Sequence, residues 1–242
     1  MRKRIVLVLV LSMILSIMGC GSFLDDPEVE KSEGVMTYRE YVLAELDSEV
    51  VIETYVQGKQ KWSENTATIY TQDADGGYLL YNMSCSESEY NKLSTGTKIR
   101  VTGIKAEWSG ESEIANATFE IIDGSYTAKP EDVSDLLKSE DLIKKQNMLV
   151  SFAGMKVEDS GNGAACTYNK DASGVPGDDL YFLVSKNGET YQFCVESSLC
   201  DSSSEVYTTV ESLGVGDIVD MEGFLYWDEV ACPHITSIKI VK

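Results

Sequence analysis

Side chains that could carry out catalysis are scarce in this sequence and lie apart. The single histidine, His234, has no second histidine and no Cys-x-x-Cys pair near it. A hydrogen-bonded loop residue is therefore favoured over a general base or a zinc ligand. Two acidic groups could attract a cation, and these are Asp73 with Asp75, and Asp171 with Asp178 and Asp179. The first group lacks the glutamate that closes an EF-hand loop and fits a hairpin turn better.

The common motifs of nucleophilic and phosphate chemistry are also missing from the sequence. There is no Gly-x-Ser-x-Gly elbow, no Ser-x-x-Lys with its partner motifs and no glycine-rich loop that could hold a phosphate. We therefore predict no catalytic residue, no metal site and no cofactor. The protein is expected to bind a partner rather than to act as an enzyme.

Aromatic residues offer the better candidates for binding. Trp62, Trp108, Tyr78 and Tyr81 are spaced so that they fall on or beside neighbouring strands of one predicted barrel. Such rings can stack on sugars, bases or peptide side chains. The alternative is that part of the set fills the barrel core, because side chains alternate between the two faces of a strand.

The composition is that of a globular chain with a strong acidic excess. Of 242 residues, 43% are hydrophobic and 25% are charged, with 40 Asp+Glu against 20 Lys+Arg and a net charge of −20. Repulsion of phosphate disfavours nucleic acid and anionic lipid as partners. A glycan or a peptide is favoured as the ligand, while solubility alone also explains such a charge. The sequence does not indicate an oligomeric state.

The first residues form a targeting segment. Arg2, Lys3 and Arg4 precede an uncharged run that ends at Met18 and is too short to span a bilayer comfortably. The run continues into Gly19 and Cys20, which resembles the lipobox of bacterial lipoproteins. This resemblance implies a signal peptide over residues 1–19 and a lipid on Cys20. A plain secretory signal or an uncleaved anchor is the alternative.

A lipid on Cys20 would place the protein on the extracytoplasmic face of a bacterial cell membrane. Its link to the membrane would then be the N-terminal lipid. The following residues, 20–35, are small and acidic and read as a tether.

An internal repeat organises the rest of the chain. Gly96 and Gly103 have the same spacing as Gly216 and Gly223, and a tryptophan follows shortly after the second glycine of each pair. The repeat predicts one domain over residues 36–127 and a second over 146–242. Residues 128–145 contain a proline and an amphipathic run, and we interpret them as a helical linker.

Each copy reads as three strands, a short helix and two further strands. In the first copy Ser86 and Glu89 form a capping box that starts this helix. Five strands with a helix between the third and fourth is the order of the OB-fold, a Greek-key barrel. The fold class is therefore mainly β, with two tandem OB-fold-like barrels. An SH3-like barrel or an open sandwich is the alternative.

Two segments of the first copy, Tyr78 to Cys85 and Gly96 to Gly110, are similar to OB-like domains of secreted and lipid-anchored bacterial proteins. The second copy has matching runs at Gly223 to Trp227 and Pro233 to Thr236. The chain resembles a group of uncharacterised two-domain lipoproteins, related to OB-like modules beside extracellular nucleases. The resemblance implies an OB-like fold and a location at the bacterial surface, and it brings no catalytic residues. Together with the rest of the sequence it leads us to predict a surface binding or adaptor module. An accessory component of extracellular nucleic-acid processing, or a structural envelope protein, is the alternative.

Five cysteines remain beyond Cys20, an odd number for an exported chain. Cys166 and Cys232 fall in loops that approach each other in an OB barrel, so we predict a disulfide between them. Cys194 paired with another cysteine is the rival. Cys85 and Cys200 share a repeat position, which predicts a small buried role for both.

Overall fold

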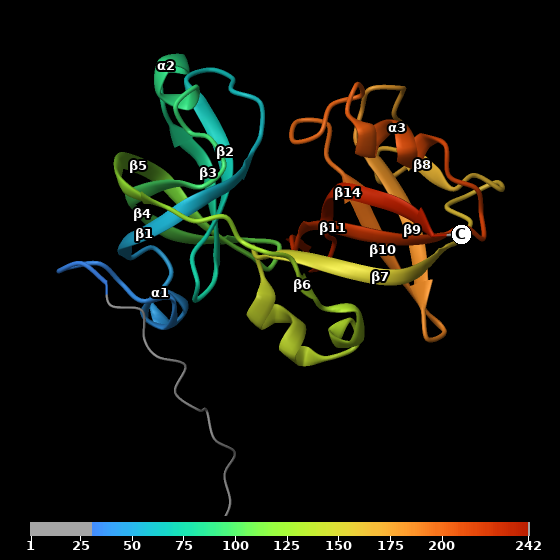
Figure 1. Ribbon diagram of the computed structural model, residues 1–242, viewed down its shortest axis with the longest axis horizontal. Helices are drawn as coiled ribbons and strands as arrows, with labels where there is room; N and C mark the ends of the chain where they lie inside the picture. The colour runs from blue at the N-terminus through green and yellow to red at the C-terminus, as the bar shows by residue number, and fades with distance from the viewer. Residues whose placement is uncertain (1–30, 242) are drawn as a thin grey trace, which may run out of the picture.

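Two five-stranded barrels follow one another along the chain in the computed structural model, which describes residues 31–241 (Figure 1). The predicted signal peptide, Cys20 and most of the tether lie outside these residues. Within them, no helix is long and apolar enough to cross a membrane.

The first barrel closes in the strand order β1-β2-β3-β5-β4, with β4 paired back to β1. This order, with the short helix α2 between β3 and β4, is that of the OB-fold. The capping box of Ser86 and Glu89 is present and starts α2 as predicted. The elements are β1 Glu49–Lys59, β2 Thr66–Gln72, β3 Gly77–Ser84, α2 Glu87–Tyr90, β4 Thr97–Trp108 and β5 Glu111–Ser125.

The second barrel repeats this arrangement. Its sheet has the order β6-β7-β11-β14-β10-β9-β8, and a further β7–β9 pairing closes the five central strands. The helix α3 again lies between the third and fourth barrel strands. The elements are β7 Leu149–Val157, β8 Cys166–Tyr168, β9 Leu180–Lys186, β10 Glu189–Val195, α3 Glu205–Glu211, β11 Ile218–Phe224 and β14 His234–Val241. A small hairpin, β12 Trp227–Asp228 with β13 Val230–Ala231, occupies the loop before β14. The prediction of two tandem OB-fold-like barrels is confirmed.

The segment between the barrels differs from the expected helix. Residues 128–145 form the short strand β6 Glu131–Asp132 and two 3-10 helices, η1 Ser134–Leu136 and η2 Glu140–Lys145. β6 pairs in parallel with β7, so the linker joins the sheet of the second barrel. Val133 and Leu142 are buried in that barrel's core, which explains the amphipathic pattern without a continuous helix.

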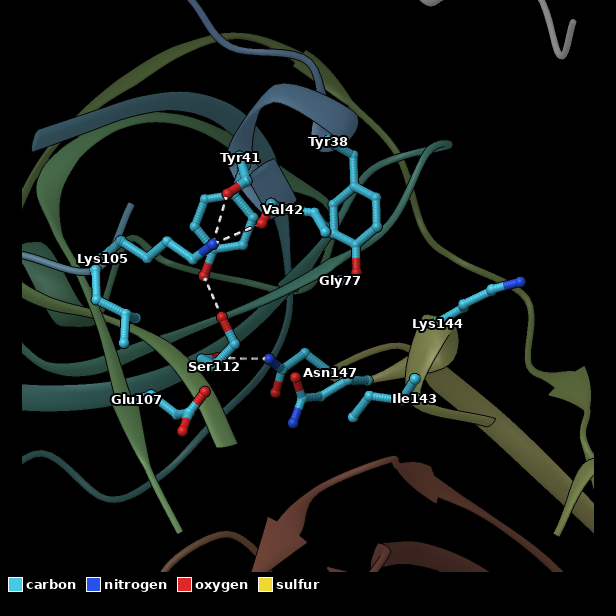
Figure 2. Close-up of a pocket in the computed structure, with 12 residues that line it drawn as sticks. Tyr38, Tyr41, Val42, Gly77, Lys105, Glu107, Ser112, Ile143, Lys144 and Asn147 are labelled. Atoms are coloured by element: carbon cyan, nitrogen blue, oxygen red, sulfur yellow. Dashed lines mark hydrogen bonds between the residues drawn. The ribbon is translucent and has the colours of Figure 1, made fainter. Parts of the chain in front are cut away.

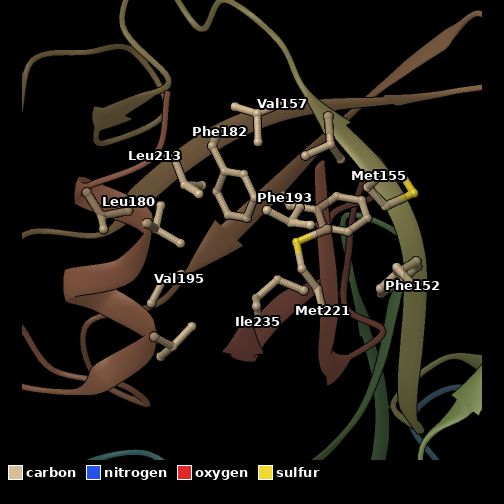
Figure 3. Packing of buried hydrophobic residues seen from close by; sticks show 14 of the residues in the cluster. Phe152, Met155, Val157, Leu180, Phe182, Phe193, Val195, Leu213, Met221 and Ile235 are labelled. Atoms are coloured by element: carbon tan, nitrogen blue, oxygen red, sulfur yellow. The ribbon is translucent and has the colours of Figure 1, made fainter. Parts of the chain in front are cut away.

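Each barrel has its own apolar core. In the second barrel the rings of Phe152 and Phe182 contact the ring of Phe193 edge-on, with centroids 4.6 and 6.1 Å away (Figure 3). In the first barrel Ile69 and Leu80 belong to the inner cluster. The α-helix α1, Tyr38–Leu43, precedes the first barrel and buries Tyr41 against that core.

Candidate functional site

In the first barrel, β2 and the first half of β3 are buried on both faces. Ile69 pairs with Leu80, and both point into the barrel core. Tyr70 pairs with Leu79 on the opposite, outer face, yet these residues are only 0% and 2% exposed. Phe224 of the second barrel forms a third apolar cluster with them. The second barrel therefore covers the outer face of β2 and of the start of β3.

A stack of aromatic rings forms the centre of this contact. The rings of Tyr70 and Phe224 are parallel to within 6°, with centroids 4.3 Å apart. The hydroxyl of Tyr70 lies 2.8 Å from Nδ1 of His234, and the ring of Tyr226 stacks on the same imidazole at 4.2 Å. His234 is 8% exposed and its Nδ1 also lies 3.1 Å from Glu196 Oε2. The single histidine is thus part of the contact between the two barrels.

Hydrogen bonds surround these rings. Gln72 Oε1 accepts from the backbone N–H of Leu149 at 2.7 Å. The first barrel's loop between β1 and β2 and its loop between β4 and β5 also bond to the second barrel. These bonds are Gln60 Nε2 to Glu196 Oε1 at 2.7 Å, Lys61 N–H to the Ser198 carbonyl at 2.8 Å, and Glu229 N–H to the Ser109 carbonyl at 2.7 Å. An OB-fold uses this strand face and these two loops to bind ligands. In the first barrel they hold the second barrel instead.

The four aromatic residues selected from the sequence do not form one surface. Trp62 is half-buried against the barrel core, and its indole N–H donates to the Cys85 carbonyl at 3.0 Å. Tyr78 is 0% exposed and belongs to the same core, so its ring offers a ligand no surface. Tyr81 and Trp108 are 47% and 68% exposed. Only these last two remain available for stacking.

The aspartates considered as cation ligands accept hydrogen bonds from backbone N–H groups. Asp73 Oδ1 accepts from the backbone N–H of Asp75 and of Gly76, and its Oδ2 lies 2.6 Å from Lys31 Nζ, as in a hydrogen-bonded hairpin turn. Each aspartate of the second group accepts a backbone N–H, and these bonds are Asp171 with Ser173, Asp178 with Val175 and Asp179 with Ser197. Among residues 31–241, no group of three or more His, Cys, Asp and Glu is placed to hold a metal ion.

The cysteines of the described chain are all free, including Cys166 and Cys232. Cys166 lies on β8, where it pairs with Phe182. Cys194 contacts the loop that holds Cys232. Its backbone N–H donates to the carbonyl of Pro233, the residue after Cys232, at 3.0 Å. Burial raises the pKa of the Cys232 thiol to about 12. Cys85 is buried at 4% exposure, whereas Cys200 is half-buried.

A pocket with a volume of about 380 Å³ opens where α1, the first barrel and the linker meet (Figure 2). We call it the junction pocket. Sequence reasoning missed it, because its walls come from five separate segments. Half of its lining residues are aromatic, aliphatic or glycine and half are polar or charged. They are Tyr38, Tyr41, Val42, Leu46, Gly77, Lys105, Glu107, Ser112, Ile143, Lys144, Gln146 and Asn147.

Lys105 fixes the helix that forms one wall of the junction pocket. Its ammonium donates to the carbonyl oxygens of Tyr41, Val42 and Ala44 at 3.0, 2.8 and 2.9 Å. These are carbonyls at the end of α1, where a cation is favoured. Burial lowers the pKa of Lys105. At the other end of α1, Thr37 and Glu40 form a capping box. The wall is therefore held at both ends.

Tyrosines from α1 face the polar floor of the junction pocket. The hydroxyl of Tyr41 lies 3.1 Å from Ser112 Oγ, and Asn147 Nδ2 donates to the Ser112 carbonyl at 2.9 Å (Figure 2). Tyr38 stands beside Tyr41, with ring centroids 6.3 Å apart. Burial, with the charge of Asp73, raises the pKa of Tyr38 to about 12, so its hydroxyl is a neutral hydrogen-bonding group at physiological pH.

The rim of the junction pocket exposes large apolar side chains. Val42, Leu46 and Ile143 line it and are 51%, 53% and 42% exposed. Leu43, next to Val42 on α1, is 73% exposed. Contiguous exposed apolar residues beside a concave site are characteristic of a contact surface.

Comparisons with solved structures find several that are similar to this chain, all at low sequence identity. No family model and no curated protein matches the chain. A murine DNA-binding protein bound to double-stranded DNA shares 11% identity and a TM-score of 0.38, over 81% of this chain and 99% of that one. A deletion mutant of the single-stranded DNA-binding protein from Thermus aquaticus shares 14% identity and a TM-score of 0.27, over 80% of this chain and 94% of that one.

A replication protein A heterotrimer bound to single-stranded DNA is also similar, with 13% identity and a TM-score of 0.31. That match spans 80% of this chain and 48% of the other. The expectation from charge that nucleic acid is disfavoured as a partner is corrected by these structures, since they are DNA-binding proteins, two of them with DNA bound. The bound DNA is a feature of those two structures and is not a finding about this chain.

Proposed function

We propose that this protein is a non-catalytic binding module and that the junction pocket is its ligand site. The observation that carries the proposal is the pocket itself, of about 380 Å³, within the range of ligand pockets. Tyr38 and Tyr41 form an aromatic wall, and Ser112 contributes a hydroxyl at the floor. An OB-fold would use the outer face of β2 and β3, and here the second barrel covers that face over β2 and the start of β3.

The exposed rim favours a peptide as the ligand. A molecule confined to the pocket would leave Val42, Leu43 and Ile143 in contact with water. A peptide that places one aromatic or branched aliphatic side chain in the pocket would cover them as well. The net charge of −20 favours a basic peptide. Of the charged residues that line the pocket, Glu107, Lys105 and Lys144, Glu107 is the group with which a basic residue beside that anchor would pair.

A peptide-display selection on the purified protein tests this function. Selected sequences should share an apolar anchor with a neighbouring Lys or Arg. Val42→Glu and Ile143→Glu should each weaken binding of a selected peptide at least tenfold. Val175→Glu is the matched control, because Val175 is 62% exposed and lies in a loop of the second barrel. Equal binding by all three variants would reject the junction pocket as the site.

Oligonucleotide binding is the second candidate, and the exposed ring of Trp108 favours it. Trp108 ends β4 at the β4–β5 turn, a loop that contacts ligands in OB-folds. Its 68% exposure leaves the ring open to a base, and such stacking contributes about 1–3 kcal/mol. Fluorescence anisotropy with a labelled single-stranded dodecamer and a duplex tests this. Binding should be lost in Trp108→Ala and kept in Tyr81→Ala.

Attachment to a membrane is part of the proposal. Cys20 lies outside the described residues, and its lipidation rests on the lipobox resemblance. Cys20→Ala should move the protein from the membrane fraction to the unprocessed or released fraction. A mature N-terminus downstream of Cys20 in the wild type would contradict a lipid at this position.

A further inference from the structure

A buried carboxyl group lies behind the junction pocket. Glu111, the first residue of β5, is 0% exposed. Its Oε2 accepts from the backbone N–H of Trp227 at 2.7 Å and from Gln146 Nε2 at 3.3 Å. Trp227 belongs to the second barrel, and Gln146 is the residue that follows the linker helix η2. This one carboxyl therefore joins the first barrel to two later segments of the chain.

The second oxygen of this carboxyl has no donor. Glu111 Oε1 and the neighbouring Asn147 Oδ1 are both buried without a hydrogen-bond partner. Both atoms are acceptors when Glu111 is ionised. A proton on the carboxyl removes the buried charge and turns one oxygen into a donor, because a neutral carboxyl donates through its O–H. A buried charge that lacks a counter-ion is costly.

No cation compensates a charge on Glu111. Among the described residues it forms no salt bridge, and its surroundings are mostly acidic or phenolic. Burial, with a smaller contribution from Glu113, raises its pKa to about 8, against hydrogen bonds from Trp227, Asn147 and Gln146 that favour the charged form. Titratable and charged groups on the elements around it are Glu113 on β5, Lys105 and Glu107 on β4, Tyr38 and Tyr41 on α1, Tyr70 on β2, Lys144 and Lys145 on η2, Tyr226 and Asp228 before β13, and His234 on β14.

We propose that protonated Glu111 is a latch that holds the junction together, and that its ionisation loosens the floor of the junction pocket and releases the bound ligand. The coupling follows from shared residues. Gln146 and Asn147 line the pocket, and Ser112 follows Glu111 directly on β5. An ionised Glu111 is a buried charge without a cation beside it, so water must enter from the adjoining pocket to solvate it. That water competes for the hydrogen bond between Asn147 and Ser112 at the floor.

The regulation of binding rests on the proposed function, but the latch itself is testable in the unliganded protein. NMR titration from pH 5.5 to 9.5 would follow the side-chain carboxyl carbon of Glu111, the side-chain amide of Asn147 and the backbone amide of Trp227. We expect all three to change together with a midpoint near pH 8, the value that burial gives this carboxyl. Glu111→Gln should abolish the transition at Asn147 and Trp227. Glu107→Gln, a carboxylate at the mouth of the pocket, is the matched control and should leave it intact.

A Glu111 carboxyl carbon that titrates below pH 6 would overturn the latch. This measurement uses the wild-type protein, so it can be made even if Glu111→Gln does not fold. An Asn147 transition that survives in Glu111→Gln would also overturn it. For the coupling, affinity for a peptide selected on the pocket should fall about tenfold from pH 6.5 to 9.5, within the usual range for coupled sites. A pH-independent affinity would refute the coupling. If Glu111 titrates as expected but no selected peptide binds the pocket, the proposed function would be rejected and the latch would stand.

Discussion

Phe224 of the second barrel lies flat on Tyr70 of the first, with ring centroids 4.3 Å apart and planes within 6°. Offset and stacked aromatic pairs stabilise proteins beyond the area that they bury. Both rings are almost completely buried, although each belongs to a strand face that an isolated barrel would leave in water. The two barrels therefore depend on each other for stability.

Phe224→Ala should lower the free energy of unfolding by about 3–5 kcal/mol, the usual loss for a buried phenylalanine. The cavity would lie between the barrels rather than inside one, so small-angle scattering should show a larger radius of gyration. Val215→Ala, a substitution of a 47% exposed residue, is the control in the same urea titration. A loss under about 1 kcal/mol would mean that the stacked pair does not join the barrels in solution.

Gly58→Ala should destabilise the junction through a steric clash. A Cβ at Gly58 would lie 2.7 Å from Cε2 of Phe224, and that ring is fixed by its stacking on Tyr70. Overpacking of this kind costs about 1–3 kcal/mol. At Gly214 the nearest atom to an added Cβ is Asp217 Oδ2 at 3.5 Å, an ordinary contact, so Gly214→Ala serves as control. Equal melting temperatures of the two variants would contradict this packing.

Lys105→Met should free the helix α1 while keeping the apolar stem of the side chain. Three carbonyl oxygens would lose their donor, a change that we expect to cost about 1–3 kcal/mol. Hydrogen exchange should become faster at the amides of α1 and stay unchanged in the second barrel. Lys92→Met removes an exposed lysine of the same barrel and should have no such effect. Unchanged protection of α1 in Lys105→Met would show that the ammonium is dispensable.

The two tryptophans of the first barrel should respond differently to substitution. Trp108→Ala should change stability by less than about 0.5 kcal/mol, as expected for an exposed position. Trp62→Ala should cost about 2–3 kcal/mol, because it removes core contacts and the indole N–H to the Cys85 carbonyl. Chemical denaturation of both variants measures this. The reverse order of stabilities would mean that Trp62 is the ring open to a ligand.

Stability should depend on pH through Glu111. Its pKa is about 8 in the folded protein against an ordinary value of 4.5, so the folded state holds a proton that the unfolded state has released. The contribution to stability is complete below pH 4.5, decreases as the pH rises and is lost above about 8. The difference in unfolding free energy between wild type and Glu111→Gln isolates this contribution. A difference that stays constant from pH 4.5 to 8.5 would contradict it.

The sequence was sufficient to predict each barrel but not the contact between them. The repeated glycine spacing and the capping box at Ser86 belong to single copies, so they report on local strand and helix order. The outer face of β2 is covered by residues far along the chain, and Tyr70 is 164 positions from His234. One signal was present: β2 contains Thr68 and Thr71 beside Tyr70 and shows no clear polar face. A strand that is apolar or uncharged on both sides indicates burial on both.

The junction pocket was beyond sequence reasoning for a related physical reason. Tyr38, Lys105, Ser112 and Asn147 come from a helix, two strands and a linker end, and no periodicity connects them. Lys105 appears in the sequence as one more surface lysine, whereas the structure buries it under α1. Glu111 likewise reads as an ordinary turn residue after Gly110. Its burial depends on the second barrel being in place.

The stacking of Phe224 on Tyr70 also fixes the order of the duplicated copies. A gene in which the two halves were exchanged, or one half was duplicated again, would leave one of these rings without its partner and an apolar face open to association. The two barrels therefore cannot replace one another, as the units of a modular repeat can. Shuffled variants of this chain should aggregate or dimerise, even though every barrel strand would be retained.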